Sequence, residues 1–206
     1  MNAPRGGDAF SHVPVPAGGS GPARSAEPDA AAGVREPERA LRGLVVTASN
    51  RASAGVYADR GGPLLAEGLE KLGFAVDGPR VVPDGDPVEQ ALREGVAAGY
   101  DVILTTGGTG ISPTDRTPDA TARVLDYEVP GIPQAIRAEG LAKVATAALS
   151  RGLAGVAGHT LIVNLPGSPG GVRDGLAVLA RILPHAVDQI RGGDHPRPAE
   201  PHGSTS

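Results

Sequence analysis

The fold is decided by "LTTGGTGISPTDRTPDAT" at residues 104–121, where a short apolar run gives way to glycines, hydroxyl side chains and acids. The apolar run predicts the end of a buried strand, and Thr117 opens a predicted helix. An ordinary turn needs one glycine, whereas Gly107, Gly108 and Gly110 leave the backbone bare along the whole loop. The stretch therefore predicts a strand, a loop and a helix, and the loop either binds an anion or forms a tight turn.

Outward from this stretch, apolar runs and helical patterns alternate along the chain. Apolar runs bounded by turn residues predict strands, and apolar residues at helical spacing predict helices. Predicted strands cover residues 41–49, 74–84 and 101–106, with a strand pair over 153–165; predicted helices cover residues 61–73, 86–99, 131–144 and 169–191, with one more from Thr117. This order predicts a three-layer α/β/α fold with a mostly parallel central sheet.

Parallel strands bring their carboxyl ends to one edge of the sheet, where ligands of such folds bind. We therefore expect the loops after Ser49, Val82 and Thr106 to lie together and to form the site. The helix after the second loop is expected to have Asp86 at its N-cap and Pro87 as its first residue.

The composition fits one folded domain between two tails. Apolar side chains make up 40% of the 206 residues and aromatic ones 2%, so the core must be aliphatic. Residues 1–39 and 193–206 have few large apolar side chains and are expected to be disordered, which leaves residues 40–192 as the domain.

Charge, cysteine content and hydropathy exclude several classes of function. The net charge of −4 offers no basic footprint for nucleic acid, and the absence of cysteine excludes disulfides and thiolate chemistry. No apolar run is long enough to span a membrane, and the start of the chain lacks the pattern of a signal peptide. We therefore expect a soluble cytoplasmic protein.

The acids near the predicted site fall into two groups. Asp86 and Asp119 have structural explanations, because each lies at the start of a predicted helix. Asp84 and Asp115 lie in the loops at the predicted ligand edge and have no such explanation. Two carboxylates beside an anion-binding loop suit Mg²⁺, which takes oxygen ligands and bridges phosphates.

A second glycine-rich loop, "NLPGSPGGV" at residues 164–172, connects a predicted strand to the last helix. Ser168 and Pro169 fit the cap and first residue of that helix, so an ordinary capped turn is as good an interpretation as a binding loop. Gly167 leaves more bare backbone than a cap needs.

Other polar residues carry weaker signals. Ser150 and Arg151 are explained by solvation of a helix end, and Arg173 and Asp174 by a solvated helix face. The histidines have no metal-ligand spacing, so no transition-metal site is predicted.

Four strings in this order, "VVPD", "LTTGGTGISPTDRTPDAT", "ALSR" and "LIVNLPGSPGGV", resemble the MogA/MoaB family of molybdenum-cofactor biosynthesis. The resemblance covers about residues 41–192. It implies a three-layer α/β domain that assembles as a homotrimer and uses Mg²⁺ and ATP to adenylate the terminal phosphate of molybdopterin, with release of pyrophosphate. It also implies a molybdenum-insertion enzyme as a partner.

Carried over by position, the resemblance implies that Asp84 and Asp115 are the catalytic and metal-binding acids. The other positions that it implies contact the ligands are Ser49, Thr106, Gly107, Gly108, Thr109, Gly110, Ser150, Asn164, Pro166, Gly167 and Ser168. Where the family commonly has an acid and a serine, this chain has Asn50 and Gly61. These two departures affect the ligand contacts expected near the first loop.

Two other functions are compatible with the same resemblance. A non-catalytic molybdopterin-binding paralogue needs the glycine loops without the acids, and the presence of Asp84 and Asp115 argues against it. A molybdate-inserting or nucleotide-hydrolysing enzyme on this fold resembles longer multidomain chains.

Overall fold

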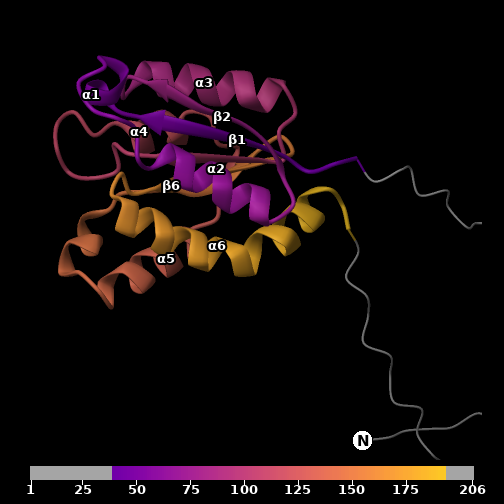
Figure 1. Ribbon diagram of the computed structural model, residues 1–206. Helices are drawn as coiled ribbons and strands as arrows, with labels where there is room; N and C mark the ends of the chain where they lie inside the picture. Colours follow the sequence, from indigo (N-terminus) through magenta and orange to yellow (C-terminus); the bar gives the residue numbers. More distant parts are fainter. Residues whose placement is uncertain (1–38, 194–206) are drawn as a thin grey trace, which may run out of the picture. The chain divides into compact units, whose positions relative to one another are not determined.

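The computed structural model describes residues 39–193, which form an α/β domain around one six-stranded sheet (Figure 1). The strands are β1 Arg42–Ala48, β2 Ala75–Val82, β3 Val102–Thr106, β4 Tyr127–Glu128, β5 Ala154–Ala157 and β6 Thr160–Leu165. The helices are α1 Asn50–Ser53, α2 Gly62–Lys71, α3 Asp86–Ala97, α4 Thr117–Ala122, α5 Gly131–Leu141, the 3-10 helix η1 Ala145–Leu149 and α6 Pro169–Ile190.

The sheet is mostly parallel, with strand order β2-β1-β3-β6-β5-β4. Strands β2, β1, β3 and β6 run parallel, whereas β5 and β4 add an antiparallel edge. The strand pair predicted over residues 153–165 forms the β5–β6 hairpin, which turns at Gly158 with a φ of 57°. The predicted fold class is therefore confirmed.

Buried strand residues alternate between the two faces of the sheet, so both faces must be covered. Helices cover them. Leu44 of β1 packs in one apolar cluster with Leu92 of α3, while the adjacent Val45 packs in the other with Leu65 of α2 and Leu179 of α6. In Figure 1, α3 lies on one side of β1 and β2, with α2 and α6 on the other. Each fully buried leucine contributes about 1.5–3 kcal/mol relative to exposure.

The parallel strands bring the predicted loops to one edge, as the sequence predicts. The backbone N–H of Ser49 donates to the carbonyl of Val82 at 2.9 Å, which joins the loops after β1 and β2. The N–H of Gly107 donates to the carbonyl of Leu165 at 3.2 Å, which joins the loops after β3 and β6.

Three details differ from the sequence predictions. The N-cap of α3 is Gly85, at a φ of 96°, and Asp86 is the first helical residue, so the capping prediction is wrong by one position. The helix predicted over 131–144 ends at Leu141 and is followed by η1. Sequence reasoning missed β4 and α1. The predicted tails lie outside the described residues, apart from Arg39 and Gly193 at the two ends.

Candidate active site

The glycine loop after β3 packs tightly against its neighbours. Gly107 has a φ of 94°, and a Cβ there would overlap the carbonyl oxygen of Ala48. Gly108 has a φ of 60°, and a Cβ there would overlap Oδ2 of Asp84. Glycine is therefore required at both positions to bring the loop against β1 and against an acid, whether or not a ligand is bound.

The same loop presents free backbone donors. The N–H groups of Gly108, Thr109 and Gly110 have no acceptor within residues 39–193. Successive N–H groups in a turn can form a concave site for an anion, so the loop has the donors that such a site needs. The tight packing of the glycines is therefore compatible with the prediction that the loop binds an anion.

Asp84 is held in place by neutral donors. Its Oδ1 accepts from the hydroxyl of Thr117 at 3.0 Å and from the N–H of Gly85 at 2.7 Å, and its Oδ2 accepts from the N–H of Arg116 at 3.2 Å. Its own N–H donates to Oδ1 of Asn50 at 3.1 Å. Asn50, a departure from the family pattern, therefore ties the first loop to this acid.

Asp115 lies against the other end of the loop. A Cβ on Gly110 would lie 2.7 Å from its Oδ2, which accepts from the N–H of Ser112 at 3.0 Å. Within residues 39–193, neither Asp84 nor Asp115 forms an ion pair with an arginine or lysine side chain. Both carboxylates therefore remain available to bind a cation.

Arg151, which the sequence analysis attributes to solvation of a helix end, instead bonds the loops of the candidate site. Its backbone N–H donates to the carbonyl of Thr109 at 2.7 Å, and its guanidinium donates to the carbonyls of Gly110 and Asp115 at 2.9 and 2.6 Å. The same guanidinium donates to both carboxylate oxygens of Asp119 at 3.2 and 3.0 Å. Arg151 therefore holds the glycine loop, the acid loop and α4 together.

The Arg151–Asp119 contact also shifts the titration of both groups. Hydrogen bonding to Asp119 raises the pKa of Arg151, with smaller contributions from the charges of Asp115 and Asp84. Hydrogen bonding to Arg151 lowers the pKa of Asp119. Asp119 lies in the first turn of α4, as predicted. Its hydrogen bonds to Arg151 show that it also holds the guanidinium in place.

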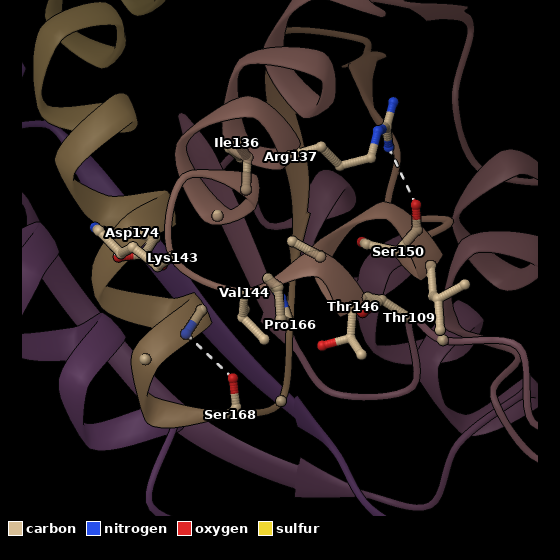
Figure 2. A pocket seen from close by; sticks show the side chains of 17 residues that line it. Thr109, Ile136, Arg137, Lys143, Val144, Thr146, Ser150, Pro166, Ser168 and Asp174 are labelled. Carbon is tan, nitrogen blue, oxygen red and sulfur yellow. Dashed lines mark hydrogen bonds and ion pairs between the residues drawn. The ribbon is translucent and has the colours of Figure 1, made fainter.

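A cavity of about 460 Å³, called here the main cavity, opens beside the glycine loop (Figure 2). Its walls come from the loop after β3, from α5 and η1, and from the loop between β6 and α6. The predicted site residues that line it are Thr109, Gly110, Ser150, Pro166, Gly167 and Ser168. Arg137 also lines the cavity, and Figure 2 shows its bond to the carbonyl of Ser150, which measures 3.3 Å.

A second cavity of about 300 Å³, called here the β1 cavity, lies at the carboxyl end of β1. Ser49 and Thr106 line it, and Gly167 lines both cavities. Its lining residue Asp59 is fully engaged, since it accepts from the hydroxyl of Thr47 and from the N–H groups that follow it. A Cβ on Gly61 would lie 2.8 Å from Oγ1 of Thr106, so glycine at this departure makes room for that threonine.

Asn164 lies beneath the site rather than in it. Its side chain is buried, its Nδ2 donates to the hydroxyls of Thr105 and Thr121 at 3.0 and 2.9 Å, and its Oδ1 accepts from Leu153 at 3.1 Å. The amide is thus saturated by protein and joins β3, α4 and the start of β5. The prediction that it contacts a ligand has no support in this geometry.

The β6–α6 loop has the predicted cap and one unexpected acid. Ser168 is the N-cap of α6, and its hydroxyl accepts from the N–H of Gly171 at 3.1 Å. Asp174 is only 13% exposed and forms an ion pair with Lys143 at 2.5 Å, so the expected solvated face is wrong for Asp174. The contact with Asp174, the largest cause, raises the pKa of Lys143.

No group of three or more histidine, cysteine, aspartate or glutamate side chains in residues 39–193 is arranged to hold a metal ion. No helix of that segment is long and apolar enough to cross a membrane.

The fold and the site define a class: an α/β domain with a glycine-rich loop and two acids at the carboxyl ends of its parallel strands. Residues 44–185 match the family described as "Probable molybdopterin binding domain", and the chain belongs to that family. The relatives of this chain confirm the resemblance of its sequence to the MogA/MoaB family.

Three relatives illustrate the similarity. The chain is 45% identical to the molybdopterin adenylyltransferase of Haemophilus influenzae, over 64% of this chain and 69% of the relative. It is 38% identical to the molybdenum cofactor biosynthesis bifunctional protein of Chlorobaculum tepidum, over 75% of this chain and 50% of the relative. The solved structure of the molybdopterin biosynthesis Mog protein from Mycobacterium ulcerans is 56% identical, with a TM-score of 0.71, and the match covers 74% of this chain and 98% of that one.

The chain spans about half the length of the first curated relatives it matches. The activity of those longer proteins is therefore a proposal for this chain.

Proposed function

We propose that this chain is a molybdopterin adenylyltransferase, which transfers AMP from Mg-ATP to the terminal phosphate of molybdopterin. The observation that carries the proposal is the pairing of free loop N–H groups with two unneutralised acids. The donors are those of Gly108, Thr109 and Gly110, and the acids are Asp84 and Asp115. This arrangement suits a phosphate on one side and a cation-bound polyphosphate on the other.

The two acids provide the kind of oxygen ligands that Mg²⁺ takes. Mg²⁺ in phosphate-transfer sites is held by one or two carboxylates, with water and substrate phosphates supplying the other ligands. Asp84 and Asp115 supply that donor set, and the packing of each against a loop glycine sets it close to the anion loop. When bound there, Mg²⁺ would neutralise charge on the triphosphate.

The protein's own part in the reaction is positioning and charge stabilisation. The nucleophile is a phosphate monoester, whose second pKa of about 6 leaves it mostly ionised at neutral pH, so no general base is required. We propose that the N–H groups of residues 108–110 hold this phosphate. Arg151 would act through the loop carbonyls that it binds, which keeps the donors and Asp115 in register.

The two cavities suggest where each substrate binds. The main cavity carries apolar side chains such as Ile136 and Val144, which suit a flat ring, and we assign it the pterin. We assign the adenosine to the β1 cavity. Gly167 lines both, so the phosphates of the two substrates would meet beside the glycine loop.

Three further features remain proposals drawn from the family resemblance: assembly as a homotrimer, a molybdenum-insertion enzyme as partner, and a cytoplasmic location. Exposed apolar side chains at Leu141, Val144 and Leu149 are compatible with contacts between copies. Light scattering on the purified chain would test the trimer directly.

A binding-only paralogue is the second candidate. It needs only the N–H donors of residues 108–110 to hold the pterin phosphate and would make no use of the two acids. A turnover assay separates the two functions: the purified chain is given molybdopterin and Mg-ATP, and pyrophosphate release is followed. We expect release with the wild-type chain and with Glu67→Gln, a surface acid of α2 paired with Lys71. Tight binding of molybdopterin without release would support the paralogue instead.

A further inference from the structure

One wall of the main cavity carries a charged pair that the proposed chemistry does not use. Asp174, in the second turn of α6, is mostly buried, and its Oδ1 lies 2.5 Å from Nζ of Lys143. Lys143 follows α5 and also bonds Glu139 at 3.1 Å. Both Asp174 and Lys143 line the main cavity, and Figure 2 shows them together at one side of it.

The pair retains unused hydrogen-bonding capacity. A carboxylate can accept at both oxygens, and within residues 39–193 no donor bonds Oδ2 of Asp174. An ammonium has three protons, and Lys143 gives one to Asp174 and one to Glu139. The cavity wall therefore offers acceptor sites and a donor side by side.

The rest of the lining suits a flat ring with a polar edge. Ile136 and Val144 give apolar surface, while the glycine loop and Ser168 approach from other sides. A ring seated on the apolar surface would turn its polar edge to Asp174 and its substituent to the loop. The carboxylate is the charged acceptor of this lining, because the other charged side chains in it, Arg137 and Lys143, are cations.

We propose that Asp174 and Lys143 read the 2-amino-4-oxo edge of the pterin. The two N–H donors of that edge, on the amino group and on the adjacent ring nitrogen, would bond the carboxylate of Asp174, and the oxo group would accept from Lys143. The inference rests on the proposed function, because it takes the ring that enters the main cavity to be a pterin. Asp174 is thus a specificity-determining residue.

The chemistry predicts which rings are rejected. A lumazine has an oxo group in place of the amino group, so one oxygen of the carboxylate would face an acceptor and lose its donor, while the ring N–H could still bond the other oxygen. We expect the wild-type chain to bind the pterin at least about tenfold more tightly, which corresponds to about 1.4 kcal/mol. In Asp174→Asn the amide can donate to the lumazine oxo group, so the preference should vanish or reverse.

The test uses 6-hydroxymethylpterin phosphate and 6-hydroxymethyllumazine phosphate, which share the phosphate and differ at the ring edge. Fluorescence titration gives both affinities for the wild-type chain, Asp174→Asn, Lys143→Gln and Glu67→Gln. Lys143→Gln should weaken both ligands by similar factors, because both carry the oxo group that Lys143 would bond, and Glu67→Gln should match the wild-type chain. Thermal unfolding checks each fold.

Equal affinity of the wild-type chain for the two ligands, or no binding of either at millimolar concentration, would overturn the inference. So would a preference that survives in Asp174→Asn, or Lys143→Gln binding both rings as the wild-type chain does. The titrations need no ATP, so they are independent of turnover. If the chain distinguishes the two rings but releases no pyrophosphate, this inference stands and the proposed adenylyl transfer fails. If the chain releases pyrophosphate but does not distinguish the rings, only this inference fails.

Discussion

At the amino-terminal edge of the sheet, Asp101 is buried, and its Oδ1 accepts from Arg39 and Arg191, each with a nitrogen at 2.8 Å. Its Oδ2 accepts from the N–H of Arg42 at 2.7 Å. At the carboxyl edge, Asp84 and Asp115 are bonded by neutral N–H and hydroxyl donors. One edge neutralises its carboxylate with cations from both ends of the domain, whereas at the other edge neither Asp84 nor Asp115 is paired with a cationic side chain of residues 39–193.

The difference separates two uses of an acid. A buried carboxylate paired with arginines is satisfied and its removal is felt as stability. A carboxylate fixed by neutral donors is oriented without losing its charge, which is what binding a cation requires. Substitutions at the two edges should therefore affect different measurements.

The largest expected effect is on activity, at the carboxyl edge. Asp84→Asn and Asp115→Asn keep the shape and remove the charge, so pyrophosphate release should fall at least about a hundredfold, or about 2.7 kcal/mol in transition-state stabilisation. The melting temperature should stay near that of the wild-type chain. Near-normal turnover in both variants would remove the cation site and break the comparison.

Next in size is the stability effect at the opposite edge. Asp101→Asn leaves Arg39 and Arg191 without their carboxylate, and because both guanidiniums are partly exposed we expect a cost of roughly 2 kcal/mol, below the full penalty for a broken buried pair. Urea unfolding measures it. Turnover at a temperature where the variant is folded should match the wild-type chain, and a selective loss of turnover would contradict the division between edges.

Arg151 sharpens the comparison, because it is a cation that binds the carbonyls around Asp115 instead of its carboxylate. Arg151→Ala should lower turnover about tenfold, or about 1.4 kcal/mol, by loosening the loop that carries the free donors. Arg151→Lys, which keeps the charge but not the forked donor set, should recover only part of this loss. Full recovery by lysine would show that charge alone matters.

The smallest expected effect concerns pH. Bonding to Arg151 lowers the pKa of Asp119 in the folded state below its ordinary value, so this contact stabilises the fold above that value and the contribution is lost as pH falls through the folded pKa. The pair is about half exposed, so solvent screening limits it to a few tenths of a kcal/mol. The stability gap between the wild-type chain and Asp119→Asn should therefore narrow below about pH 4, as urea unfolding at two pH values would measure.

The sequence by itself determined the order of strands and helices, the parallel sheet and the edge where the loops meet. Continuous apolar runs such as 101–106 and the helical spacing of residues 169–191 are local signals, and parallel pairing follows from strand–helix alternation. Asp84 and Asp115 stood out because they lie at the predicted ligand edge and, unlike Asp86 and Asp119, are not at the start of a predicted helix. The residue-by-residue site came from the resemblance of the motifs to a family.

Only the tertiary structure decided how these residues act. Asp101, Arg151 and Asp174 have no distinctive local pattern, and their partners lie from 31 to 90 positions away in the chain. The family resemblance implied that Asn164 contacts a ligand, but its side-chain amide donates to Thr105 and Thr121. A hydrogen bond across such separations depends on how layers pack, so its partner, and hence whether a charge is neutralised or left free, is fixed only when the fold is complete.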